Sequence, residues 1–136
     1  MSDYDYHVHT GLNLIEVHPA GVVQLSDILS YAQEVLSRDL ITEGTIEYVD
    51  LSEMTNLSLD YKTANALNGT LQKWSARGWQ GSIFFAPQAH QFGMIRMIGA
   101  IAGGLEGSLG GMMIPSREPI SLDEVRDLIA QRRQIS

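Results

Sequence analysis

The alternation of hydrophobic and polar positions predicts short strands at the start of the chain. Residues Tyr6–Thr10 and Leu12–His18 are rich in β-branched and aromatic residues and are separated by Gly11. This pattern is typical of two antiparallel strands joined by a hairpin. Three later runs predict further strands: Thr45–Leu51, Ser82–Ala86, which is apolar and closed by Pro87, and Met112–Ile114.

Between these runs, hydrophobic residues recur at the spacing of one helix face, which predicts four helices. The apolar positions are Ile28, Leu29, Ala32, Val35 and Leu36 in the first helix, which starts at Ser26, and Ala64, Leu67, Leu71 and Trp74 in the second, which stops at Gly78. A third helix covers Gln91 to Ala102. The fourth begins at the capping box Ser121-Leu-Asp-Glu124 and buries Leu122, Val125, Leu128 and Ile129.

Glycines follow the third helix, at Gly103, Gly104, Gly107, Gly110 and Gly111. Phosphate-binding loops follow a strand and open a helix, whereas these glycines follow a helix and precede a strand. We therefore expect a flexible turn here and no phosphate site.

The predicted order is β-β-α-β-α-β-α-β-α, in which the later strands alternate with helices and so become parallel neighbours. At 136 residues and 44% hydrophobic content, the chain is sized for one continuous core. We expect one α/β domain over residues 1–136, with a mixed central sheet of about five strands and four α-helices.

This order of elements, together with the segment Tyr48-Val-Asp-Leu-Ser-Glu-Met-Thr55, resembles the STAS fold of anti-sigma factor antagonists and of the STAS-like proteins grouped with SpoIIAA. The resemblance covers nearly the whole chain and implies a domain that works by binding protein partners. In that family the loop after the central strand ends in Asp-Ser-Ser-Gly. Its second serine, at a helix start, is phosphorylated by a partner kinase to break the complex.

Counted without gaps from Asp50, those four positions are Ser58, Leu59, Asp60 and Tyr61 in this chain. The motif is therefore absent, and a carboxylate at the acceptor position leaves permanent negative charge near a helix N-terminus. A small gap would restore Ser58 as acceptor, with Thr55 as a second candidate. The alternative role for Ser58 is an ordinary helix N-cap.

Charge and cysteine content exclude several kinds of protein. The net charge of −7 and the nine scattered Lys and Arg residues argue against a nucleic-acid partner. The absence of cysteine excludes disulfides, thiol nucleophiles and Cys-based zinc sites. An acidic, aromatic N-terminus is unlike a secretory signal, and the apolar stretch Met94–Leu105 is shorter than the roughly 20 residues that span a membrane. We expect a cytoplasmic protein without a transmembrane segment.

The four histidines are the candidates for acid-base or metal chemistry. His7 and His9 share one side of a predicted strand, but no third ligand stands at a recognisable spacing, so we expect no metal and no cofactor. His18 is expected in a loop. His90 follows Pro87 at the carboxyl end of a central strand, where parallel sheets bind ligands. An alternative function is a small hydrolase or transferase that uses His90 with Asp50 or Asp60, although the sequence shows no catalytic set.

The third helix is apolar on almost every side, with Gln91 and Arg96 as its polar exceptions. Its apolar residues are Phe92, Met94, Ile95, Met97, Ile98, Ile101 and Leu105. Either the last helix and the glycine turn cover it, or it forms an exposed patch for a homodimer or a small apolar or lipid-like ligand.

We expect a non-enzymatic domain that binds a protein or a small apolar ligand through the loop Ser52–Asp60 and the start of the third helix. A partner switch controlled by phosphorylation is the third possibility. The expected binding or regulatory residues are Ser52, Thr55, Ser58, Asp60, His90, Phe92 and Arg96.

Overall fold

The computed structural model describes residues 4–103 and 112–135 and contains a five-stranded sheet. Its strands lie in the order β1 (Tyr4–His9), β2 (Leu14–Pro19), β4 (Ile46–Asp50), β6 (Gly81–Phe85) and β7 (Met112–Ser116). β1 pairs with β2 in antiparallel orientation, and the remaining neighbours are parallel. The short 3-10 helix Thr10–Leu12 joins β1 to β2. The predicted mixed sheet, opened by a hairpin, is confirmed.

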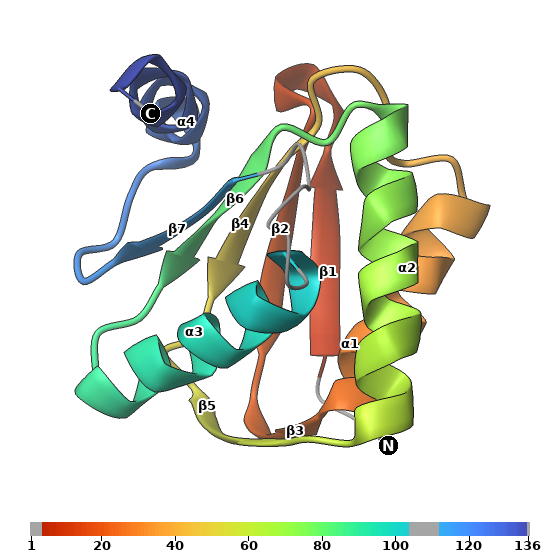
Figure 1. The fold of residues 1–136 in the computed structure, drawn as a ribbon. Coiled ribbons are helices and arrows are strands. Elements are labelled where there is room, and N and C mark those ends of the chain that lie inside the picture. The colour runs from red at the N-terminus through yellow and green to blue at the C-terminus, as the bar shows by residue number, and fades with distance from the viewer. Residues whose placement is uncertain (1–3, 104–111, 136) are drawn as a thin grey trace.

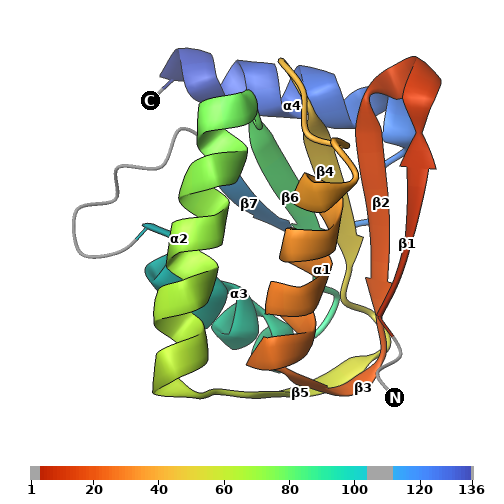
Figure 2. The same cartoon turned by 90° about the vertical axis from the view of Figure 1, so that its right-hand side faces the viewer.

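Four α-helices cover this sheet, as predicted: α1 (Leu25–Ser37), α2 (Tyr61–Arg77), α3 (Ala89–Gly103) and α4 (Leu122–Ile135). Figure 1 shows α1, α2 and α3 on one face of the sheet and α4 apart from them, on the opposite face. The same division is visible in Figure 2, where α4 runs behind the strands. Among the described residues, no helix combines the length and the hydropathy needed to cross a membrane.

Two strands that the sequence analysis missed form a second, two-stranded parallel sheet. β3 (Gly21–Gln24) pairs with β5 (Met54–Ser58), so the prediction of a loop over Ser52–Asp60 is wrong for most of its length. β5 buries its first and fourth residues and exposes the others, which is not the strict alternation of a half-buried strand. Both figures place this small sheet at one end of the molecule, beside the N-terminus of α2.

The sheet separates two hydrophobic cores. The larger one lies under α1, α2 and α3 and contains the aromatic residues Tyr31, Trp74, Trp79 and Phe84. The smaller one packs the α4 stripe against the other face and comprises Leu14, Ile46, Tyr48, Ile83, Ile114, Val125 and Ile129, with Leu122 and Leu128 partly buried against it. The predicted stripe of α4 is therefore confirmed. At its start, the amide of Glu124 donates to the carbonyl oxygen of Ser121 at 2.9 Å.

Helix α3 uses its apolar residues inside the domain. Met94, Ile95 and Ile98 are buried in the larger core, and the helix packs on α2 and β5. The alternative in which the last helix covers α3 is wrong, because α4 lies on the opposite face of the sheet. Of the apolar residues predicted for this helix, Met97 is 37% exposed. Leu105 and the glycines at 104, 107, 110 and 111 lie outside the described residues.

Candidate functional site

The segment from Ser52 to Asp60 runs from the carboxyl end of β4, along the end of the molecule, to the start of α2 (Figure 1). The amide of Ser52 donates to Asp50 Oδ1 at 2.9 Å, which fixes the turn after β4. The remainder is held by its pairing with β3. The side chains of Thr55 and Ser58 are both exposed.

Asp60 is the N-cap of α2. Its Oδ2 atom accepts hydrogen bonds from the amide of Thr63 at 3.2 Å and from the Thr63 hydroxyl at 2.5 Å. These bonds lower the pKa of Asp60, so the helix starts with a fixed negative charge, which the helix dipole favours. Ser58 is instead the last residue of β5, paired with Gln24. The alternative that Ser58 serves as the N-cap is therefore wrong.

Three large hydrophobic side chains are exposed at this end of the molecule. Val22 on β3 is 66% exposed, Leu59 is 50% exposed, and Tyr61, the first residue of α2, is 86% exposed. We call these three residues the apolar end. The hydrophobic pattern of the sequence does not mark them as binding residues, although Leu59 and Tyr61 directly flank the N-cap residue Asp60.

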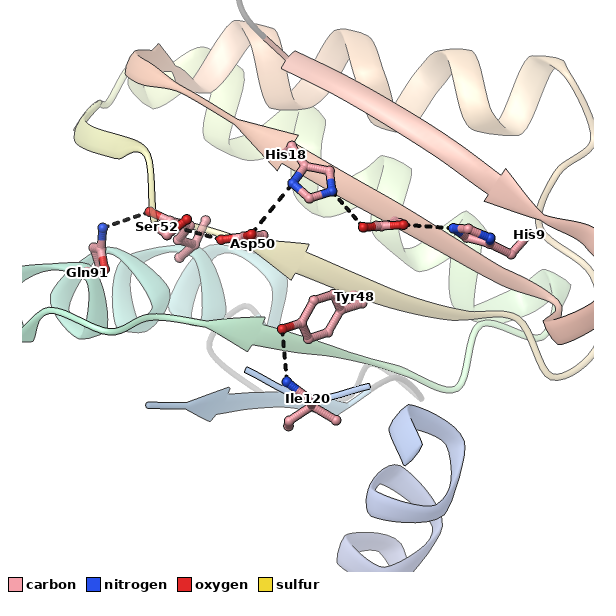
Figure 3. Close-up of polar contacts among 9 residues, drawn as sticks. His9, His18, Tyr48, Asp50, Ser52, Gln91 and Ile120 are labelled. Atoms are coloured by element: carbon pink, nitrogen blue, oxygen red, sulfur yellow. Dashed lines mark hydrogen bonds and ion pairs between the residues drawn. The ribbon is translucent and has the colours of Figure 1, made fainter. Parts of the chain in front are cut away.

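Gln91 ties the start of α3 to this end of the molecule. Its buried amide donates to the carbonyl oxygens of Leu51 at 2.7 Å and Met54 at 3.2 Å, and its Oε1 accepts from the amide of Gln88 at 3.0 Å. Figure 3 shows Gln91 beside the turn that carries Ser52. The loop and the third helix therefore meet, as expected, but through a residue that the sequence analysis treated only as a polar exception.

The remaining predicted residues of α3 do not form a catalytic arrangement. His90 and Arg96 are exposed, and Phe92 is partly buried with the Arg117 guanidinium 4.9 Å from its ring centre. Among the described residues, no hydrogen bond or ion pair connects His90 to Asp50 or Asp60. The hydrolase or transferase alternative required such a carboxylate, so the geometry removes its basis.

A polar row that the sequence did not reveal lies on the sheet face that carries α4 (Figure 3). Glu16 bridges two imidazoles: its Oε1 lies 2.7 Å from His9 Nε2 and its Oε2 lies 2.7 Å from His18 Nε2. His18 Nδ1 lies 3.6 Å from Asp50 Oδ2. Burial raises the pKa of Glu16, but the hydrogen bonds from His9 and His18 outweigh burial and lower it.

The position of His18 in this row corrects one expectation from the sequence. His18 belongs to β2 rather than to a loop. The rings of His7 and His9 lie 5.0 Å apart, in keeping with their predicted common side. Within the described residues, no group of three His, Asp or Glu side chains is placed to hold a metal ion. On the same face, the amide of Ile120 donates to the Tyr48 hydroxyl at 3.2 Å, which ties the segment before α4 to β4.

A partly open cavity of about 40 Å³ lies in the larger core, lined by apolar side chains and by Tyr31 and Glu47. Such a volume holds a few water molecules, whereas typical ligand pockets measure about 300 to 1,000 Å³. Glu47 accepts hydrogen bonds from the hydroxyls of Tyr31 and Ser82, each at 2.5 Å. Burial raises the pKa of Glu47, and hydrogen bonds from Ser82 and Tyr31 only partly oppose this. A small apolar or lipid-like ligand would need a larger cavity than this one.

Comparison with solved structures places this arrangement among known folds. The anti-sigma factor antagonist SpoIIAA in its unphosphorylated form aligns over 93% of this chain and 97% of its own, with a TM-score of 0.52 and 10% identity. The chain has a SpoIIAA-like fold. An uncharacterised DUF3478 protein from Shewanella loihica PV-4, described as having a SpoIIAA-like fold, aligns over 95% of both chains with a TM-score of 0.58 and 12% identity.

These structural likenesses confirm the STAS-like fold that the sequence resemblance implied. No protein-family model matches the chain, and neither does the sequence of any curated protein. At this level of identity the SpoIIAA-like fold alone is shared, and its function in this chain has to be argued from the residues present.

Proposed function

We propose that this chain is a STAS-type regulatory domain that binds a protein partner through the apolar end and carries out no chemistry of its own. The observation that carries the proposal is the exposure of Leu59 and Tyr61 on either side of the charged N-cap Asp60, with Val22 exposed on the adjoining strand β3. Isolated exposed hydrophobic residues are ordinary on protein surfaces, whereas several gathered at one site mark an interaction surface.

The side chains present suit an interface. Tyrosine offers a large, rigid contact surface with a polar tip and is frequent among the residues that dominate binding energy. Tyr61 is almost fully exposed, so a partner can desolvate nearly all of its ring. The ionised carboxylate of Asp60 stands beside it. We therefore expect the partner to present an apolar hollow with a basic rim.

The fixed charge of Asp60 bears on regulation. The STAS resemblance implies a serine at this position whose phosphorylation breaks the complex, whereas here the position is permanently negative. We propose that the charge at this position is constant, so that phosphorylation at residue 60 does not control binding. A switch at Thr55 or Ser58 remains compatible with their exposed position on β5.

Photo-cross-linking in the cells that make the protein tests the proposed surface. A benzophenone amino acid replaces Tyr61 in one variant and Gln131, on the exposed side of α4, in the control. We expect a discrete protein adduct at position 61 and none of that mass at position 131. Equal adducts at both positions, or none at position 61, would argue against the proposal.

The affinity for the protein captured in this way provides the second measurement. Because exposed aromatic anchors dominate interfaces, Tyr61→Ala combined with Leu59→Ser should raise Kd by about tenfold or more. Met97→Ala, a truncation of an exposed residue on α3, is the matched control and should leave Kd unchanged. Asp60→Asn keeps an N-cap while removing the charge, and so measures the contribution of the basic rim.

Phosphorylation is tested on the same complex. If the switch acts through the exposed hydroxyls, the host kinase should add a phosphate that Ser58→Ala or Thr55→Ala prevents, and the phosphorylated chain should lose its partner. Intact-mass measurement on protein from its own host reports the modification directly. A chain that is unmodified under all growth conditions supports constant binding.

A further inference from the structure

Strand β1 is an edge strand without the usual protection. The sheet order places it at one end of the five strands. Its six residues pair with β2 in one unbroken register, and none of them is Pro or Lys. Native proteins normally blunt an edge of this kind with such residues or with a bulge, because its free backbone groups attract another strand. β7, at the opposite edge, contains Pro115.

The side chains of β1 alternate in a way that favours pairing. Asp5 and His7 are exposed on one face, whereas Tyr4, Tyr6 and Val8 are partly covered on the other face, towards α1. Among the interactions of the described residues, no hydrogen bond or ion pair involves the side chain of Asp5 or His7. The strand thus carries one unpaired acid and one unpaired base, two positions apart.

This spacing is complementary to itself. If two β1 strands meet in antiparallel orientation around an axis at Tyr6, Asp5 of each copy lies opposite His7 of the other copy. Axes at Asp5 or at His7 instead bring identical side chains together at the centre, and parallel pairing opposes acid to acid. A carboxylate and an imidazole that face each other across a strand pair can hydrogen-bond, whereas like charges directly opposite destabilise the pair. One register therefore satisfies both copies.

We propose that the chain forms a homodimer by antiparallel pairing of β1 with β1 of a second copy, centred on Tyr6. The two five-stranded sheets then become one continuous sheet, and the exposed edge disappears. A surface groove of about 440 Å³ along β1, bordered by Glu34 and Arg38 of α1, leaves room for the incoming strand. The Tyr6 hydroxyl donates to Glu34 and accepts from Arg38, which orders the wall of this groove.

Charge exchange tests the register. Sedimentation equilibrium of the purified full chain should show a dimer. His7→Asp places acid opposite acid at two symmetric positions and should weaken association by about tenfold. The double variant Asp5→His with His7→Asp restores the complementary pairs and should recover the affinity of the native chain. Gln131→Asp adds the same charge on α4 and is the matched control, expected to have no effect.

Cysteine cross-linking tests the centre of the interface, because the chain contains no cysteine of its own. Mixed Asp5→Cys and His7→Cys proteins should form a disulfide with each other faster than either forms one alone, since directly opposed residues lie closer than diagonal ones. Circular dichroism melts of each variant confirm folding.

Other results would overturn the proposal. If the chain is monomeric at about 100 µM, where even weak dimers assemble, β1 does not pair with a second copy. If a dimer forms but His7→Asp leaves its affinity unchanged, the dimer does not use the proposed pairing of β1. Tyr61→Ala should leave the dimer intact. The test of the dimer is therefore independent of the test of partner binding at the apolar end.

Discussion

Tyr31 of α1 donates a 2.5 Å hydrogen bond to Oε2 of Glu47 on β4, and both side chains are buried. The other carboxylate oxygen accepts from Ser82 of β6, whose hydroxyl oxygen accepts from Trp79 Nε1 at 3.1 Å. One acidic side chain thus connects a helix and two central strands inside the larger core. A buried carboxylate is tolerated only when its oxygens are hydrogen-bonded.

Glu47→Gln should flatten the pH dependence of folding stability. Burial raises the pKa of Glu47 in the folded chain, so the folded state keeps a proton that the unfolded chain loses above about pH 4.3. The unfolding free energy therefore falls as pH rises through this window, by at most about 1.4 kcal/mol per pH unit for one group. Urea unfolding of both proteins between pH 4 and 8, a range of about four units, measures the difference. Parallel curves would contradict the raised pKa.

Gln91→Leu should destabilise the fold by about 1 to 3 kcal/mol, because it removes the amide that satisfies two buried carbonyl oxygens. Gln91→Glu should cost more, since a carboxylate would face those same oxygens. Gln88→Ala changes an exposed neighbour that contributes only its backbone amide to Gln91 and is the control. Chemical denaturation compares the unfolding free energies of these variants with that of the native chain, provided that their m-values are equal. A Gln91→Leu variant as stable as the native chain would show that water replaces the amide.

The elements that the sequence predicted are those with a strong internal signal. α4 carries a regular apolar stripe, and Val125 and Ile129 are buried as that stripe requires. β6 is apolar because both of its faces are covered, which a short apolar run bounded by Pro87 already indicates. In such cases local pattern and tertiary environment agree.

The elements that it missed depend on contacts distant in sequence. β3 and β5 are short and become strands by pairing with each other across the whole of α1. Glu47 reads as the polar position of a strand, yet its carboxylate is buried because Tyr31 and Ser82 meet it there. His18 contacts the carboxylates of Glu16 and Asp50. The spacing of residue types along the chain does not reveal contacts between residues that are distant in the sequence.

Two glycines of α2, one at its end and one in its interior, should respond in opposite directions to alanine. Gly78 ends α2 with a φ of +117°, and a Cβ there would lie 2.5 Å from the Glu43 Cα atom. Gly78→Ala should therefore destabilise by more than about 1 kcal/mol. Gly69 lies inside the same helix with open space around it, so Gly69→Ala should stabilise by about 0.5 to 1 kcal/mol. Thermal unfolding of the pair shows both signs, and equal shifts would contradict the left-handed helix end.

Glu16→Gln should change stability with the opposite pH dependence to Glu47→Gln. The hydrogen bonds from His9 and His18 lower the pKa of Glu16 below that of the unfolded chain. A lowered carboxyl pKa contributes stability above the unfolded value, and this contribution is lost as pH falls through the folded value. The native chain should therefore exceed Glu16→Gln in unfolding free energy near neutral pH, and the two should converge in acid. Convergence at high pH instead would mean that the imidazoles do not stabilise the carboxylate.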